Sequence, residues 1–523
     1  MLSTRRKFLT AGGAAAALAL GGNLPEIRSA AAGWTGRADR RDPFTLGVAS
    51  GDPLPDAVVI WTRLAPDPLA PFGGMDRRPV EVQWQVAEDA QFHRIVRSGA
   101  TRTGPEASHS VHVDVRGLRP WREYWYRFRV NGRLSPVGRT KTAPAYGAQL
   151  SELSLAFASC QAWWEGWYTA YADMARREHD VVFFLGDYIY EFGIDRGIRP
   201  GSNEPHITRQ TVTLDEYRQR YAAYRMDPDL QSAHASAPWV VTLDDHEVVD
   251  NWADEAHPSA PPAQFRVRRA NAFRAYWEHM PLRLSSLPKG PDMQLYRRFR
   301  FGRLAEFSVL DTRQYRSDQA YGDGTKAPGP ETKDPARTIT GDAQEKWLLD
   351  GWAASQTRWN VLAHQTAIAR LDTKEGPEVL VPMDTWDGYE ASRNRILGGA
   401  VQRKVRNLVS IAGDLHRNVA SDLKLDFDDP ASATVGAEFV GTSISSGMDG
   451  QDLDPGGATL LRENSHMKFG NFQRGYVSCR VTPQQWISDY RVVDKVSVQG
   501  GTVSTRAKLL VEDGRPGIAE VQQ

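Results

Sequence analysis

Six short apolar runs in the middle and later parts of the chain are each followed by acidic, thiol or imidazole side chains. Of all features of the sequence, this pattern constrains the possible fold most strongly. The runs cover residues 153–159, 181–185, 239–243, 307–310, 360–363 and 408–412. Runs of this length predict buried strands, and the helical stretches between them indicate an α/β domain. Because ligands bind outside the carboxyl ends of strands in such sheets, we expect the residues after the runs to meet at one rim.

The side chains that the six runs would bring to this rim form an unusual set. They are Cys160, Asp187, Tyr190, Asp245, His246, Asp311, Asp414 and His416. Several acids without partners would repel one another and shift each other's pKa values, and bound cations would remove that repulsion. The pattern therefore predicts a metal site.

The spacing of the rim residues narrows the choice of metal. Asp187 and Tyr190 follow Gly186 on one turn, and a carboxylate beside a phenolate suits a hard ion such as Fe³⁺. A thiolate from Cys160 also suits iron. We expect Asp311 to form a structural ion pair with Arg313, two positions later.

Composition excludes several other classes of protein. The chain has 64 basic and 64 acidic side chains, so it lacks the basic excess of a nucleic-acid or anionic-membrane binder. Its 2 cysteines are too few for a disulfide scaffold or a four-cysteine zinc site, and Cys479 in a strand-like run is expected in the core. The sequence contains no Walker loop, Gly-x-Ser-x-Gly elbow or His-Glu-x-x-His pair. The glycine-bounded run 441–447 is interpreted either as a phosphate cradle or as a turn over the site.

The first 32 residues are typical of an export signal. Arg5 and Arg6 precede an apolar run at 11–20, and small residues follow at 29–32. This pattern resembles a twin-arginine (Tat) signal peptide, so we expect a soluble, secreted mature protein that uses the Tat export machinery, with cell-wall association open. No other run is long and apolar enough to predict a membrane span, and no stable nucleic-acid or membrane partner is expected.

The rest of the chain is predicted to form two domains and a tail. Alternating strands and the Asn131-Gly132 turn indicate a fibronectin-III-like β-sandwich over residues 43–143. A catalytic domain is expected over 152–500 and a C-terminal tail over 501–523. Helices are predicted at 173–179, after a capping box that begins at Thr213, and at 263–279 with arginines on the outer side.

Seven motifs together resemble the alkaline phosphatase D (PhoD-like) family, a branch of the calcineurin-like metallophosphatases. They are Ala158-Ser-Cys-Gln161, Gly186-Asp-Tyr-Ile-Tyr-Glu191, Asp244-Asp-His-Glu-Val248 with Asn251, Gly413-Asp-Leu-His416, and residues 44–53, 310–315 and 386–389. The resemblance implies a four-layer α/β/β/α metallophosphatase domain after the sandwich, with one Fe³⁺ and accompanying Ca²⁺.

The resemblance also implies roles for individual residues. Cys160, Asp187 and Tyr190 would hold the iron, and Asp187 would bridge to a second metal. The further candidate metal ligands are Asp245, His246, Asn251, Asp387, Asp414 and His416. Relatives usually carry two asparagines where this chain has Asp250 and Asn251, so the ligand within 244–251 is left open.

The expected chemistry is phosphate ester hydrolysis by attack of a metal-bound hydroxide or oxide. Arg220 or Arg225 would clamp the phosphate, Asn251 would help to position it, and His416 would protonate the leaving group. The expected substrates are small phosphomonoesters and phosphodiesters, with phospholipids and nucleotides among the candidates, and the role is phosphate scavenging. The alternatives are a phospholipase D-like phosphodiesterase on the same metal centre and a non-catalytic binding module.

Overall fold

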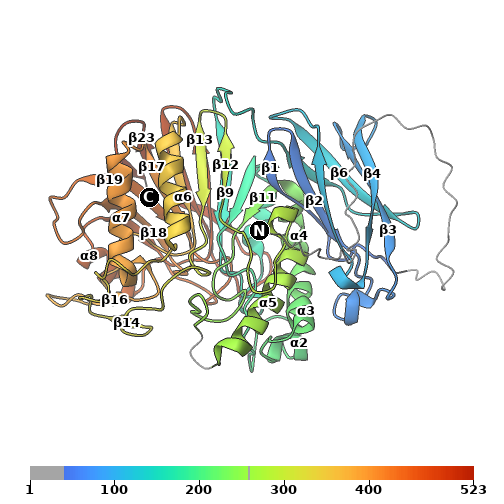
Figure 1. Cartoon of the computed structure of the whole chain (residues 1–523), viewed down its shortest axis with the longest axis horizontal. Helices are drawn as coiled ribbons and strands as arrows, with labels where there is room; N and C mark the ends of the chain where they lie inside the picture. The colour runs from blue at the N-terminus through green and yellow to red at the C-terminus, as the bar shows by residue number, and fades with distance from the viewer. Residues whose placement is uncertain (1–40, 257–259, 523) are drawn as a thin grey trace, which may run out of the picture. The chain divides into compact units, whose positions relative to one another are not determined.

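The computed structural model describes residues 41–256 and 260–522, and Figure 1 shows its helices and strands. The predicted signal peptide, residues 1–32, lies outside the described residues. Within the described ranges, no helix has the length and apolar character needed to cross a membrane.

Two large sheets form the centre of the protein. The ten-stranded sheet contains, in spatial order, β24 (Glu520–Gln522), β23 (Val503–Glu512), β22 (Gln485–Val493), β21 (Gly475–Val481), β9 (Leu153–Ala158), β10 (Val181–Phe184), β11 (Pro238–Val241), β1 (Val48–Leu54), β2 (Ala57–Arg63) and β5 (Ser110–Arg116). The seven-stranded sheet contains β12 (Arg297–Phe301), β13 (Ala305–Val309), β15 (Trp359–Ala363), β17 (Leu408–Ala412), β19 (Thr434–Val440), β18 (Asn418–Lys424) and β20 (Met467–Asn471).

The six predicted apolar runs are the parallel strands at the centres of these two sheets. β9, β10 and β11 pair in parallel in one sheet, and β13, β15 and β17 do so in the other. Their side chains are buried because each strand has a neighbour on both edges and a packed layer on both faces. The prediction of six buried strands is confirmed.

Helices cover the outer face of each sheet, which gives the predicted α/β/β/α order of layers. The rings of Phe183 and Phe307 stack between the sheets with their centroids 4.5 Å apart. On the outer face of the ten-stranded sheet lie α1 (Thr169–Ala175), α3 (Leu214–Arg225), α4 (Pro228–Ser236) and α5 (Pro262–His279). On the outer face of the seven-stranded sheet lie α6 (Asp342–Ala354) and α7 (Glu390–Gln402) (Figure 1). The short helices α2 (Pro205–Thr208) and α8 (Pro455–Glu463) lie in loops.

Local signals place two of the three predicted helices correctly. Thr213 caps α3 with the predicted box, in which Thr213 and Glu216 bond each other's backbone N–H groups. The first predicted helix, 173–179, is displaced, because Glu178 has φ 52° and a left-handed residue ends a helix. The predicted outer arginines of α5 are also partly wrong, since Arg268 and Arg269 are buried.

The N-terminal β-sandwich shares a sheet with the catalytic domain. Its second sheet contains β4 (Ile95–Thr103), β3 (Val80–Ala87), β6 (Glu123–Val130), β7 (Arg133–Leu134) and β8 (Gly138–Lys141). This sheet packs on β1, β2 and β5, and β1 pairs in parallel with β11. Gly51 permits the junction, because a Cβ there would lie 2.6 Å from the carbonyl oxygens of Trp239 and Pro281. The sequence predicts separate 43–143 and 152–500 segments but gives no sign of the shared sheet.

The predicted C-terminal tail, residues 501–523, is wrong for most of its length. Val503–Glu512 forms β23, which pairs along β22. Ala507, Leu509 and Val511 fall at every second position, so their side chains share one face of the strand and fill the space between the two sheets. Burial of these side chains is the physical reason that the segment is a strand.

Candidate metal centre

Sharp turns at the strand ends project the predicted ligands into one region. Cys160, Asp187, Asp414 and His416 all have left-handed backbone, with φ between 53° and 65°. Such a conformation costs on the order of 1–3 kcal/mol for a residue with a side chain, and it concentrates at functional sites. The polar residues after β9, β10 and β17 are therefore held in strained but fixed positions.

The side chain of Glu247 connects two of these turns through hydrogen bonds. Its buried carboxylate accepts the backbone N–H groups of Asp187 at 3.2 Å, Tyr188 at 2.6 Å and Asp244 at 2.8 Å. The turns after β10 and β11 are thereby joined through one side chain. Sequence reasoning missed this role, because Glu247 looks like one more acid of the 244–248 motif.

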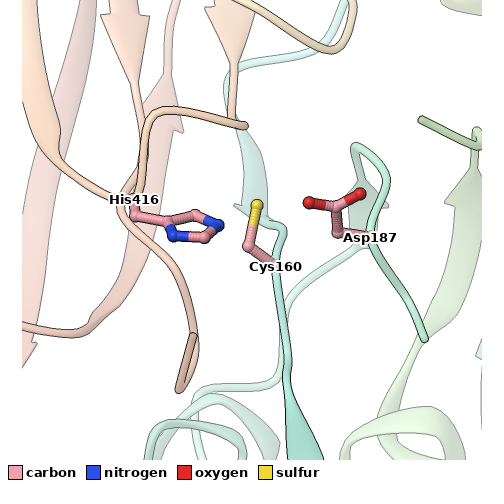
Figure 2. Close-up of side chains that lie close together, drawn as sticks. All are labelled: Cys160, Asp187 and His416. Carbon is pink, nitrogen blue, oxygen red and sulfur yellow. The ribbon is translucent and has the colours of Figure 1, made fainter. Parts of the chain in front are cut away.

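The first group of ligand atoms comes from Cys160, Asp187 and His416. One donor atom from each lies within 4.8 Å of the other two, and Figure 2 shows their side chains turned toward a common space. The Tyr190 hydroxyl lies 3.1 Å from Asp187 Oδ2 and 3.0 Å from His416 Nε2. The structure thus brings together the thiol, carboxylate, phenol and imidazole that the motifs single out.

A second group shares Asp187 with the first. Donor atoms of Asp187, Asp245 and His246 lie within 4.8 Å of one another. His246 Nδ1 lies 2.8 Å from Glu191 Oε2, which fixes the ring and leaves Nε2 toward Asp245. Asp187 Oδ1 is buried and has no hydrogen-bond partner among the described residues. A carboxylate placed between two donor groups, with one oxygen unsatisfied, fits a residue that bridges two cations.

Charge repulsion at this site is severe without a cation. Burial, followed by Asp245, raises the pKa of Asp187 well above its usual range, and burial with Asp384 raises the pKa of Asp414 to about 6. Burial and then Asp187 raise the pKa values of the Cys160 thiol and the Tyr190 phenol. Positive ions would favour the deprotonated form of all four groups, so the donor set fits bound metal.

The two histidines have opposite environments. Burial lowers the pKa of His416 to about 3, which keeps its ring neutral and able to donate a lone pair. Burial opposes a charge on His246 as well, yet Asp245, Asp187 and Glu191 together raise its pKa well above the ordinary value. His416 can thus act as a ligand in the neutral form that burial favours, whereas His246 must first lose its proton before it binds a cation.

Arg313 compensates the negative charge of two buried acids, Asp244 and Asp384, next to the ligand groups. Its buried guanidinium donates to Asp244 at 2.6 Å and to both oxygens of Asp384, at 2.9 and 2.7 Å. Arg316 also donates to Asp384, at 2.6 Å. The predicted ion pair between Asp311 and Arg313 is wrong, because Asp311 accepts the backbone N–H of Arg313 and caps a turn. Asp384 and its role were missed by sequence reasoning.

Neither predicted phosphate clamp reaches the metal groups. Arg220 is buried and donates to five backbone carbonyls, those of Tyr190, Phe192, His206, Ile207 and Arg209. Arg225 is buried as well, with its guanidinium 4.1 Å from the centre of the Trp61 ring and 3.3 Å from the Tyr188 hydroxyl. Both arginines stabilise the fold. The prediction that one of them clamps the phosphate is wrong, because both guanidinium groups are buried and already engaged by other residues.

Three other predicted ligands stand outside the two groups. Asp387 is engaged by the Arg393 guanidinium and by the Leu371 N–H at 2.9 Å, so its oxygens are already used. The Asn251 side chain donates to Asp323 at 2.6 Å, and its backbone N–H donates to Asp245. Asp414 is buried nearby and acts on the pKa of Cys160, but it is in neither group.

A cavity of about 660 Å³ opens onto the ligand groups. Tyr190, His246 and His416 line it with polar atoms, and Phe192 and Val249 add apolar side chains. The run 441–447 supplies Ser446 and Gly447 to the same cavity, where Ser446 Oγ accepts the Ala162 N–H at 2.8 Å. The run therefore forms a turn at the edge of the site, which is one of the two interpretations of its sequence.

Comparisons with known proteins identify the family of the chain and its fold. Residues 155–490 match the family model of PhoD-like phosphatase, and residues 28–144 match the N-terminal domain of the same family. Alkaline phosphatase D of Bacillus subtilis is 48% identical over 521 residues, which is 99% of this chain and 89% of the relative. The solved structure of PhoD superposes with a TM-score of 0.90 at 48% identity, covering 93% of this chain and 94% of that one. The chain therefore belongs to the PhoD-like phosphatase family.

Proposed function

We propose that the protein is an exported phosphatase that hydrolyses small phosphomonoesters and phosphodiesters to release phosphate. The observation that carries this proposal is the shared position of Asp187 between two ligand groups, whose His246 and His416 line an open cavity. Two adjacent cations suit phosphoryl transfer, because they stabilise charge on the attacking and leaving oxygens. Family membership and the absence of a serine elbow from the sequence support the same chemistry.

We propose Fe³⁺ and Ca²⁺ as the metals. Cys160, Tyr190, Asp187 and His416 supply soft, phenolic, carboxylate and imidazole donors, which suit iron. Asp187, Asp245 and the deprotonated His246 would hold the second cation. Asn251, whose backbone N–H donates to Asp245, and Asp414, whose charge acts on Cys160, lie beside the two groups and are the further candidate ligands. When bound, these cations would polarise the phosphoryl oxygens and activate the attacking oxygen.

The chain's own residues would orient the ester and manage the proton. The aromatic ring of Phe192 and the Val249 side chain exclude water from one wall of the cavity. His246 faces the Tyr190 ring at 4.3 Å and lines the cavity, and its ring would keep a proton at Nδ1, toward Glu191, while Nε2 is free to bind the second cation. With Arg220 and Arg225 committed to the fold, positioning falls to the cations and to Asn251, whose side chain would leave Asp323.

One assay separates the substrate classes. Purified enzyme with iron and calcium is tested on p-nitrophenyl phosphate, bis-p-nitrophenyl phosphate and phosphatidylcholine. Turnover of the first two supports the proposal, whereas turnover of phosphatidylcholine alone would replace it with the phospholipase D-like alternative. Failure on all three would contradict the proposed activity.

Export is proposed from the sequence of residues 1–32, where Arg5 and Arg6 precede the apolar run. Replacing this pair by lysines blocks the Tat route, so activity should stay with the cells instead of appearing outside them. Unchanged secretion of the double variant would contradict the route.

A further inference from the structure

The outer face of the ten-stranded sheet carries a second cavity, which we call the basic groove. It has a volume of about 240 Å³ and is lined by Ser154, Arg177, His179, Arg480, Asp489 and Lys508, together with their neighbours. Ser154 lies near the start of β9 and Cys160 follows its end, which at about 3.3 Å per residue separates them by roughly 20 Å. The basic groove is therefore distinct from the metal centre.

The floor of the basic groove is fixed by the register of the sheet. Cys479 points into the core between the sheets, so its neighbour Arg480 points to the outer face. β9 and β21 place Ser154 opposite Arg480, and β22 and β23 place Asp489 opposite Lys508. Charged side chains anchored on paired strands hold their spacing better than side chains on loops.

His179 presents an unused donor to the basic groove. Its side chain is 2% exposed, and burial, followed by Arg177, lowers its pKa to about 4, so the ring is neutral. Nδ1 lies 3.1 Å from Ser154 Oγ, and Nε2 is buried without a hydrogen-bond partner among the described residues. When the Ser154 hydroxyl donates to Nδ1, the ring hydrogen is on Nε2. A buried donor of this kind calls for an acceptor.

Asp489 contributes a buried acceptor that lacks a donor, the reverse of the situation at His179. Its Oδ1 is buried and makes no hydrogen bond among the described residues, and Lys508 Nζ lies 3.9 Å away, beyond hydrogen-bond distance. Arg177, Arg480 and Lys508 line the groove with this one carboxylate, while Asp173 at 3.0 Å from Arg177 and Glu152 at 3.7 Å from Arg480 pair with two of the cations from outside the lining. The groove therefore needs a ligand that is negative overall, accepts hydrogen bonds and still carries a proton to donate.

We propose that the basic groove binds hydrogen phosphate, free or as the terminal group of a small ester. Phosphate oxygens would accept from His179 and the three cations, and the remaining P–OH would donate to Asp489. Sulfate has no proton at neutral pH and would meet Asp489 as a like charge. The volume is below the range of about 300–1,000 Å³ for drug-sized ligands, as expected for an ion or a small group. This site does not depend on the proposed activity of the metal centre.

The test is calorimetric titration of the metal-loaded enzyme with inorganic phosphate at low ionic strength, alongside p-nitrophenyl phosphate turnover. The wild type should show binding at the metal centre and at the basic groove. Lys508→Met should weaken groove binding by about tenfold or more and leave turnover unchanged, because one charge-assisted hydrogen bond is lost. Lys346→Met is the matched control, since Lys346 pairs with Asp350 at an exposed position of α6 and its replacement should keep both binding events. Phosphate binding by Lys508→Met identical to that of the wild type would overturn the proposal.

Two further ligands test the recognition chemistry. Sulfate should bind the wild-type groove more weakly than phosphate, and Asp489→Asn should remove this preference. Equal binding of both anions by the wild type would overturn the role of Asp489. Phenylphosphonate, which resists hydrolysis, should bind the groove if the physiological ligand is an ester, whereas binding of inorganic phosphate alone identifies the free anion. Because turnover is read separately, failure of groove binding and failure of the proposed activity are distinguishable.

Discussion

The Arg313→Met substitution removes a cation that lies between two buried carboxylates. Arg313 is fully buried and bonds Asp244 through Nε and Asp384 through both terminal nitrogens. Methionine fills most of the same volume but leaves these acids without that partner. The effect of the change is therefore mainly electrostatic.

The size of the effect follows from burial. Removing one partner of a buried ion pair costs about 3–5 kcal/mol, because the remaining charge is left desolvated. Asp384 keeps Arg316 at 2.6 Å, so the loss is concentrated on Asp244, which precedes the predicted ligand Asp245. We expect the free energy of unfolding to fall by about 3–5 kcal/mol and the metal content to fall with it.

Guanidinium chloride unfolding followed by tryptophan fluorescence measures this loss. Arg515→Met is the matched control, since Arg515 pairs with Glu512 in an exposed position, and such a pair contributes about 0–1 kcal/mol. In the Arg313→Met, Asp384→Asn double variant, the loss in free energy of unfolding should be about 1–3 kcal/mol smaller than the sum of the losses in the two single variants. If Arg313→Met unfolds within about 1 kcal/mol of the wild type, the reasoning about the buried acids is refuted.

Three further predictions concern the site, the fold and pH. Cys160→Ser should lose bound iron and at least about 100-fold in kcat, measured by elemental analysis and p-nitrophenyl phosphate turnover, and retention of both would exclude the thiolate as a ligand. Arg220→Lys should lower the free energy of unfolding by about 2 kcal/mol or more, because the hydrogen bonds of Arg220 go to backbone carbonyls, and KM should stay within about twofold. A higher KM at unchanged stability would instead show that Arg220 binds phosphate. Burial lowers the pKa values of His112 and His466 to about 4, so the unfolded chain binds more protons and the protein should lose thermal stability as pH falls from about 6.5 to 4. A melting temperature that stays constant across that window would contradict this assignment.

The strands and the convergence of ligands follow from the sequence because both depend on local pattern. Apolar runs that end in Cys160, Asp187 and His416 identify parallel strands and the edge where they end. Capping chemistry at Thr213 likewise acts within a few residues. These signals need no knowledge of distant parts of the chain.

The errors arise where a residue's role depends on distant partners. Arg220 and Arg225 look like free cations in a motif-rich segment, but contacts with loop carbonyls and Trp61 decide their roles. Asp384 has no local signature, and only the fold brings it to Arg313, 71 positions away. The shared sheet between β1 and β11 has the same cause, because strand pairing over long separations leaves no periodic trace in either strand.

Metal analysis of the purified enzyme, combined with its visible absorption spectrum, tests the central claim most directly. The account predicts iron in stoichiometric amount with calcium, and a charge-transfer band from Tyr190 and Cys160 that changes in Cys160→Ser. Zinc alone, with no iron and no visible band, would contradict the proposed ligand set.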